Sequence, residues 1–297
     1  MILLTGASGF LGKIIREELL KSDVVHTLGR DPQHDIVCDL SKQGFSNQHA
    51  YSLVVHCAGK AHSVPRTAEE KAAFYDVNYN GTVQLCRSLS ASGKLPAYFV
   101  FISTVAVYGV EAGEGINEEH PLNGDTPYAE SKIQAEAFLT EWSKEHGVIL
   151  SIVRLPLIAG HNPPGNLGAM INGIRTGRYL SIKGVNARKS VVMATDIAAI
   201  IPVMSKIGGI YNLTDSYHPT FVELEATIAS QLGKARPMAI PLWMARFLGR
   251  VGDLAGNRSP INSLKLSKII STLTFDDSKA KASLGWRPHR VLDEFKI

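Results

Sequence analysis

A glycine-rich turn between an apolar strand and a helix lies at the start of the chain and restricts its fold more than any other feature. Residues 2–4 form an apolar run typical of a buried strand, and apolar residues recur at helical spacing over residues 11–20. Gly6, Gly9 and Gly12 lie in between, where they allow a tight turn and let backbone N–H groups approach a pyrophosphate. A strand, a glycine turn and a helix in this order predict a nucleotide-binding α/β unit, with the positive end of the helix dipole at the phosphates.

Strand and helix patterns alternate along much of the remaining chain. Further strands are predicted over residues 24–28, 36–40, 53–57, 98–102 and 148–153. Helices are predicted over residues 67–92, 126–146, 219–232 and 241–254. We therefore expect a Rossmann-type, doubly wound parallel sheet of the α/β class, with its ligand at the carboxyl ends of the strands.

The composition is that of an ordinary globular protein, with 45% hydrophobic and 20% charged residues. The net charge of +4 comes without a basic tract, so we expect neither nucleic acid nor an anionic membrane as a partner. The three cysteines form no disulfide pattern and are expected as buried free thiols of a reducing compartment. No signal peptide or membrane-spanning run is recognisable, so the sequence predicts a cytoplasmic protein.

Tyr128 and Lys132 lie four residues apart, on one face of the predicted helix 126–146. A free tyrosine ionises near pH ~10, too high for acid–base chemistry in the cell, but a nearby ammonium favours the phenolate and lowers that pKa. Such a tyrosine can exchange a proton with a sugar or alcohol oxygen. Taken alone, a Tyr-x-x-x-Lys pair is more typical of an ordinary amphipathic helix, so its meaning depends on the rest of the chain.

The end of the second predicted strand bears on the choice of nucleotide. NAD sites usually hold an acidic residue here for the ribose 2′-hydroxyl, and none occupies positions 27–30. The planar donor fork of Arg30 could instead meet a 2′-phosphate, which favours NADP over NAD, with a solvated loop arginine as the alternative. Asp39, at the third strand, could either reach an adenine amino group or cap the following segment.

Seven short motifs follow one another along the chain. They are Gly6-x-x-Gly9-x-x-Gly12, Asp39-Leu40, His56-x-Ala58-Gly59, Asn78-x-x-Gly81-Thr82, Ser103-Thr104-Val-Ala-Val-Tyr108-Gly109, Tyr128-x-x-x-Lys132 and Gly285-Trp286-x-Pro288. In these motifs and their order the chain resembles the extended short-chain dehydrogenase/reductases, specifically the NAD(P)-dependent nucleotide-sugar epimerase/dehydratase family. The first six motifs cover about half of the chain and the last lies near its end.

The resemblance implies roles for individual residues of these motifs. Tyr128 would be the catalytic acid/base, Lys132 would hold the nicotinamide ribose and lower the tyrosine pKa, and Thr104 would bond the reacting sugar oxygen. Asn78 would position the site through backbone and water contacts. The implied cofactor-binding residues are Gly6, Ser8, Gly9, Phe10, Leu11, Gly12, Arg30, Asp39, Leu40, Ala58, Gly59, Asn78, Tyr128, Lys132 and Leu155. No metal site is implied.

The resemblance also implies two parts, a Rossmann NAD(P)-binding domain over residues 1–160 and a small C-terminal substrate-binding lobe over residues 161–297. The lobe is interleaved with the last strands and helices of the Rossmann domain. Implied substrate-binding residues are Thr104, Asn166 and Lys189, the last two for the nucleotide diphosphate, although Lys189 could also be a solvated basic turn. Trp243, Met244, Phe247 and Leu248 are expected in the core of the lobe.

The implied chemistry is hydride transfer between nicotinamide C4 and C4 of a hexose on a nucleotide diphosphate. Val105-Ala106 stand where the 4,6-dehydratases carry an Asp-Glu pair, which argues against elimination of water. We expect an NADP(H)-dependent 4-keto-6-deoxy-sugar reductase of polysaccharide precursor synthesis. The first alternative is an NAD-retaining nucleotide-sugar 4-epimerase, and the second is a catalytically inactive NADP(H)-sensing protein. The resemblance implies a homodimer formed through the helices 67–92 and 128–146.

Overall fold

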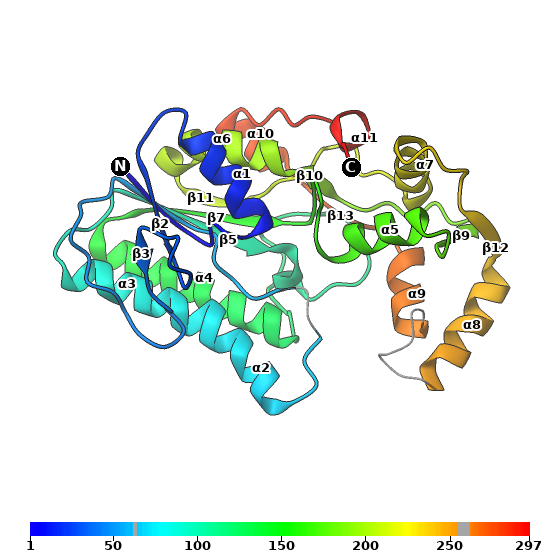
Figure 1. The fold of residues 1–297 in the computed structure, drawn as a ribbon, viewed down its shortest axis with the longest axis horizontal. Coiled ribbons are helices and arrows are strands. Elements are labelled where there is room, and N and C mark those ends of the chain that lie inside the picture. The colour runs from blue at the N-terminus through cyan, green and yellow to red at the C-terminus, as the bar shows by residue number, and fades with distance from the viewer. Residues whose placement is uncertain (62–63, 255–261) are drawn as a thin grey trace.

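A seven-stranded parallel sheet forms the centre of the chain in the computed structural model, which describes residues 1–61, 64–254 and 262–297 (Figure 1). Its strand order is β3-β2-β1-β4-β5-β7-β11. The direction of winding changes between β1 and β4, and the carboxyl ends of these strands border the crevice where ligands of such sheets bind. The strands are β1 (Ile2–Thr5), β2 (Val25–Gly29), β3 (Ile36–Val37), β4 (Leu53–His56), β5 (Tyr98–Thr104), β7 (Ile149–Leu155) and β11 (Gly209–Asn212).

Helices cover both faces of this sheet, as Figure 1 shows. On one face lie α1 (Phe10–Leu19), α6 (Ala194–Ile207) and α10 (Ser278–Leu284), and on the other α2 (Ala68–Tyr75), α3 (Gly81–Ala91) and α4 (Pro127–His146). Strand β1 is buried on both sides, because Leu4 packs into the core under α1 and α6 whereas Leu3 packs into the core under α3 and α4. The predicted doubly wound α/β sheet is confirmed.

The predicted helix 67–92 is present but is interrupted in the middle. Thr67 caps α2 by accepting a hydrogen bond from the Glu70 amide (3.2 Å), and a π-helical segment, Asp76–Asn80, joins α2 to α3. A single π turn inside a helix shifts the side-chain phase and frequently marks a functional site. It contains Asn78, which is fully buried.

The rest of the chain forms short strand pairs and helices, most of them in a smaller lobe to the right in Figure 1. The paired strands are β8 (Leu157–Ala159) with β10 (Val191–Met193), β9 (Leu180–Lys183) with β12 (Met238–Pro241), and β6 (Gly113–Ile116) with β13 (Leu273–Phe275). The helices are α5 (Gly165–Arg175), α7 (Phe221–Gln231), α8 (Leu242–Leu254), α9 (Ser263–Ile270) and the short α11 (Val291–Glu294). The predicted helices 219–232 and 241–254 correspond to α7 and α8.

Two predictions, one about the central sheet and one about the smaller lobe, are wrong in detail. The third strand spans only Ile36–Val37, because the chain turns at Asp39, whose carboxylate accepts hydrogen bonds from the amide (3.1 Å) and hydroxyl (2.6 Å) of Ser41. In α8, Trp243 and Phe247 are 69% and 62% exposed rather than part of a core. Their neighbours Met244 and Leu248 are partly buried, as expected.

The three cysteines are free, with Cys38 and Cys86 buried and Cys57 partly buried. Among the described residues, no helix is both long and apolar enough to cross a membrane.

Candidate active site

The glycine turn packs too tightly for larger residues, as the sequence suggested. Gly6 adopts a φ of +74°, and a β-carbon there would lie 2.6 Å from the Ala58 amide nitrogen. A β-carbon on Gly12 would lie 2.0 Å from the Gly6 carbonyl oxygen. Gly9 precedes α1, and none of the described side chains caps this helix. The first amides of α1 are therefore left for an anionic ligand, and the turn fits the diphosphate of a dinucleotide.

A buried relay of hydrogen bonds fixes the carboxyl ends of β1 and β4 beside this turn. Thr82 donates to the Asn78 carbonyl (2.6 Å) and so accepts from Nε2 of His56 (2.9 Å). Nδ1 of His56 then accepts from the Thr5 hydroxyl (2.6 Å), which in turn accepts from the Ala58 amide (3.1 Å). Burial, with the nearby Lys132 charge, lowers the pKa of His56 to about 3, so the ring is neutral and serves as a structural link.

Asn78 connects the segment that follows β4 to helix α4. Its Oδ1 accepts from the Lys60 amide (2.7 Å), and its Nδ2 donates to the Lys60 carbonyl (3.1 Å) and to the Ser131 hydroxyl (3.0 Å). Ser131 donates in turn to the Tyr128 carbonyl (2.8 Å). The positioning contacts expected of Asn78 thus include direct bonds that hold the Gly59-Lys60 segment against the first turn of α4.

Helix α4 is placed by local signals that the sequence contains. Thr126 accepts a hydrogen bond from the Ala129 amide (3.1 Å), Pro127 occupies the first turn, and Gly147 ends the helix with a φ of +67°. Lys132 is 4% exposed; its ammonium donates to the Ile102 carbonyl of β5 (2.8 Å) and lies 4.4 Å from the centre of the Phe101 ring. Burial lowers the pKa of Lys132 to about 8.

The structure brings Tyr128 and Thr104 together at the end of β5. Thr104 is buried and accepts a hydrogen bond from the Ala106 amide (3.2 Å), which caps the short 3₁₀ helix Val105–Tyr108. The expected lowering of the Tyr128 pKa by Lys132 is wrong for this structure. Burial raises the pKa of Tyr128, and a hydrogen bond with Thr104 only partly opposes that rise. At neutral pH the phenol therefore carries its proton.

Directly beneath these groups lies a buried ion pair that the sequence analysis missed. Arg154 of β7 donates to Glu136 of α4 at 2.7 Å, and both side chains are at most 4% exposed. Ser103 of β5 also donates to Glu136, and Arg154 donates to the Tyr108 hydroxyl (3.2 Å). Because Glu136 follows Lys132 by four residues, as Lys132 follows Tyr128, one stripe of α4 faces the sheet. The four-residue spacing in the sequence could have identified Glu136 as a residue that faces the sheet. No sequence pattern identifies Arg154 as its partner.

The other cofactor-binding residues predicted from the sequence lie around the same crevice. Leu155 pairs in register with Thr104, which places it at the carboxyl end of β7. Arg30 directly follows β2 and is exposed. The hydrogen bond from Ser41 lowers the pKa of Asp39, and the charge of Arg30 adds to this effect. Leu40 is buried beside Gly81, at the start of α3. A β-carbon on Gly59 would lie 3.4 Å from the Lys132 ammonium, so this glycine leaves the site open.

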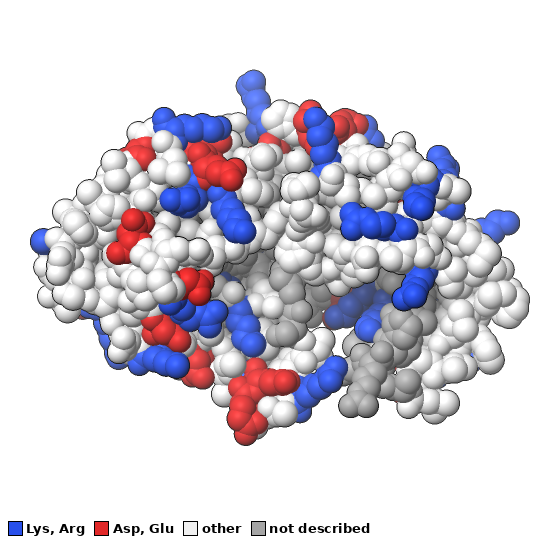
Figure 2. Space-filling model, in the orientation of Figure 1, with Lys and Arg blue, Asp and Glu red and all other residues white. Residues whose placement is uncertain are grey.

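Two of the three residues expected to bind substrate, Asn166 and Lys189, come from the smaller lobe, whereas Thr104 ends β5. Asn166 is exposed in the first turn of α5, and Lys189 is partly buried between β9 and β10. Burial lowers the pKa of Lys189 to about 8, opposed by Glu111 and reinforced by Lys268. Glu111 and Lys268 form an ion pair (3.1 Å). Figure 2 shows basic side chains in the hollow between the two parts of the molecule, where an anionic substrate would be attracted.

The described residues contain no group of three or more His, Cys, Asp or Glu side chains placed to hold a metal ion. The glycine turn, the open α1 amides and the buried ammonium of Lys132 instead fit the phosphates and ribose of a dinucleotide.

A family model described as "NAD dependent epimerase/dehydratase family" matches residues 2–213, more than half of the chain. The chain belongs to this family. It is an NAD(P)-dependent enzyme of the group that modifies nucleotide sugars.

Named relatives of this family member have two different activities. A UDP-glucose 4-epimerase of Vibrio cholerae is 25% identical over 316 residues, covering 99% of this chain and 92% of its own. A GDP-6-deoxy-D-mannose reductase of Pseudomonas aeruginosa is 27% identical over 248 residues, covering 77% and 79%. The solved structure of RMD from P. aeruginosa complexed with NADPH superposes with a TM-score of 0.74 at 20% identity, covering 99% and 96%, which supports the fold.

We predict that Glu136→Gln lowers the free energy of unfolding of this epimerase/dehydratase-family enzyme by about 3–5 kcal/mol, because Arg154 keeps its charge in a buried place without a counter-ion. Urea unfolding followed by circular dichroism measures the loss. Lys268→Ala is the control: it removes the exposed ion pair with Glu111 and should cost at most about 1 kcal/mol. Equal losses in the two variants would contradict the role of the buried pair.

We further predict that the affinity for NADPH falls as the pH rises through about 8. Lys132 has a folded-state pKa lowered to about 8, so its ammonium is present below that pH and is lost above it. Titration calorimetry measures the dissociation constant from about 1.5 pH units below that pKa to about 1.5 pH units above it. Lys132→Met should bind more weakly and without this pH dependence. A wild-type affinity that stays constant over this range would refute the assignment.

Proposed function

We propose that the protein is an NADP(H)-dependent reductase acting at C4 of a 4-keto-6-deoxy sugar on a nucleotide diphosphate. The observation that carries the choice of reductase is Arg30, exposed at the end of β2 where no acidic residue occupies positions 27–30. An arginine there suits the 2′-phosphate of NADP. NADP in turn favours a reductase over an epimerase, which keeps its cofactor bound through the whole reaction. The division into a 1–160 domain and a 161–297 lobe is part of this proposal, since it separates cofactor and substrate.

A bound nicotinamide supplies the hydride for C4 of the sugar. Tyr128 gives its proton to the C4 oxygen as that oxygen gains charge. Thr104 donates a hydrogen bond to the same oxygen and thereby fixes the ketone beside the phenol. Lys132 holds the ribose hydroxyls, and Lys189, with Asn166 on α5, binds the diphosphate across the hollow between the two parts.

A second candidate is an NAD-retaining nucleotide-sugar 4-epimerase. The family description names NAD, and the V. cholerae relative is a UDP-glucose 4-epimerase. The same three groups would serve, with Tyr128 first taking the proton of the C4 hydroxyl and then returning it. A third candidate, an NADP(H)-sensing protein without turnover, is disfavoured because Thr104, Tyr128 and Lys132 are all in place.

An assay of NADPH oxidation with UDP- and dTDP-4-keto-6-deoxy sugars, with products resolved by NMR, separates these functions. Stoichiometric loss of NADPH with a new C4 hydroxyl is the expected result. Inversion at C4 of a UDP-hexose without net change in NADPH would replace the reductase by the epimerase. Tight binding of NADPH with neither reaction would favour the sensing protein.

We predict that Tyr128→Phe lowers kcat by about 10²–10⁴ while leaving the dissociation constant of NADPH nearly unchanged, because only the proton donor is removed. Stopped-flow kinetics and calorimetry measure the two quantities. Thr140→Ala, which removes an exposed hydroxyl bonded to the Glu136 carbonyl further along the same helix, is a matched variant that keeps the phenol and should retain most of the rate. A Phe variant with wild-type kcat would exclude Tyr128 as the acid.

We predict that Arg30→Ser weakens the binding of NADPH by roughly 10- to 100-fold, the usual value of a charge-assisted hydrogen bond, and leaves NADH unaffected. Side-by-side titrations with the two nucleotides check this. Lys42→Ser changes another exposed cation nearby, which lies 4.0 Å from Asp39, and serves as the control. An equal change for NADPH and NADH would show that Arg30 does not read the 2′-phosphate.

A further inference from the structure

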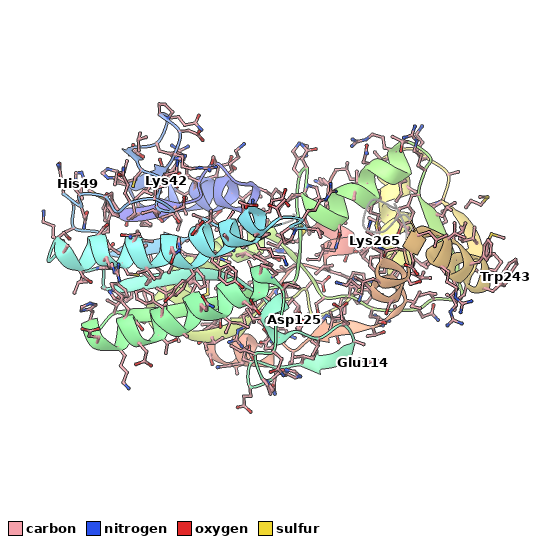
Figure 3. The ribbon with its side chains drawn as sticks, turned by 90° about the horizontal axis from the view of Figure 1, so that it is seen from below. Lys42, His49, Glu114, Asp125, Trp243 and Lys265 are labelled. Carbon is pink, nitrogen blue, oxygen red and sulfur yellow. The ribbon has the colours of Figure 1, made fainter. Side chains whose placement is uncertain are left out.

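Helix α8 presents an unusually apolar surface to solvent. Trp243, Phe247, Val251 and Leu254 are 69%, 62%, 49% and 90% exposed. At 100° per residue they fall within one stripe of the helix, whereas its opposite side, with Ala245, Gly249 and Gly252, is buried against α9 and β12. In Figure 3, Trp243 lies at the outer end of the lobe and points away from it.

Two exposed arginines lie along one edge of this stripe. Arg246 and Arg250 follow Trp243 and Phe247 by three residues each, which places them on the same side of the stripe. Within the described ranges of the chain, neither arginine forms an ion pair. The acidic residue nearest to them on the helix, Asp253, is engaged by the amide (2.9 Å) and hydroxyl (2.6 Å) of Ser263. The exposed face of α8 is therefore apolar, and its edge carries two arginines and one carboxylate, a net positive charge.

The elements that pack on α8 carry two further exposed apolar residues. Met238 in β12, just before α8, is 69% exposed, and Leu264 in α9, which packs on α8, is 60% exposed. A helix with tryptophan, phenylalanine and leucine on one side and arginines at its edge has the composition of helices that lie in the plane of a membrane surface.

We propose that the exposed face of α8 docks the protein onto an anionic lipid bilayer. Trp243, Phe247 and Leu254 would enter the boundary between headgroups and acyl chains, and Arg246 and Arg250 would meet lipid phosphates. The 13-residue helix is about 20 Å long, too short to span a bilayer but sufficient to lie in its surface. The sequence predicts no membrane partner because it lacks a basic tract and a spanning segment, and neither is needed for this mode of binding.

Charge favours lipid over a second copy of the chain as the occupant. A two-fold contact centred on the stripe would bring the arginines of both copies to the same small interface, where like charges repel. An anionic bilayer offers the complementary charge at the edge of the apolar stripe and a fluid apolar phase for side chains of different length. Binding through α8 also leaves helices α3 and α4 free for the predicted dimer.

Tryptophan fluorescence gives a direct test with the full-length protein. Trp142 and Trp286 are only 6% and 4% exposed, so Trp243 is the tryptophan that changes environment on docking. With vesicles of phosphatidylcholine and phosphatidylglycerol we expect co-sedimentation, a blue shift of the emission, and quenching by brominated acyl chains. With phosphatidylcholine alone we expect much weaker binding, since the arginines then lack anionic partners.

Paired variants assign the effect to α8. Phe247→Ser with Val251→Ser, and separately Arg246→Glu with Arg250→Glu, should each lower the partition coefficient at least about tenfold. Val203→Ser with Ile207→Ser on α6, at residues 45% and 49% exposed, is the control and should bind as wild type. Thermal unfolding of each variant confirms that it remains folded.

Three results would overturn the proposal. One is the absence of binding to the anionic vesicles, and another is equal binding to the two kinds of vesicle. The third is a wild-type oligomer, seen by light scattering, that the Phe247/Val251 variant loses, which would make a second copy the occupant. None of these measurements depends on catalytic activity, so the result stands apart from the test of the proposed reductase.

Discussion

The buried ion pair between Glu136 and Arg154 fixes how helix α4 lies on the sheet. A carboxylate and a guanidinium that are both almost fully enclosed tolerate little separation, because each would then be left charged in a medium of low dielectric. Glu136 lies two helical turns from Tyr128, and Lys132, which donates to the Ile102 carbonyl, lies one turn from it. These two contacts therefore fix the position of the Tyr128 phenol relative to the sheet. The candidate catalytic hydroxyl near the end of the helix is thereby held by the rigid middle of that helix.

A second, uncharged network holds the opposite wall of the site. Its centre is the neutral ring of His56, which joins β1 to α3 through Thr5 and Thr82, and its outer end is Asn78 on the π turn. The two networks meet at Ser131, which bonds both Asn78 and the Tyr128 carbonyl. Neither wall can move without leaving a buried polar group unpaired, so the geometry is fixed before any ligand binds.

The sequence predicts well those features that depend only on residues close together in the chain. The glycine turn and the ends of α4 follow from backbone conformation and from caps within a few residues. The pairing of Glu136 with Arg154 depends on the register between α4 and β7, which no local pattern encodes. The exposure of Trp243 and Phe247 has the same origin, since both sides of α8 are apolar and only tertiary packing decides which is buried.

Burial favours the neutral form of both Tyr128 and Lys132. It raises the pKa of the Tyr128 phenol and lowers that of the Lys132 ammonium to about 8. The enclosed site therefore holds a proton on the phenol, the state required to protonate a ketone as it is reduced. Oxidation of a C4 hydroxyl would ask the same phenol to begin as a base, against the desolvation that surrounds it. Reduction ends with the same phenolate, so in either direction positive charge, from the Lys132 ammonium or from the bound ligands, would have to stabilise that phenolate.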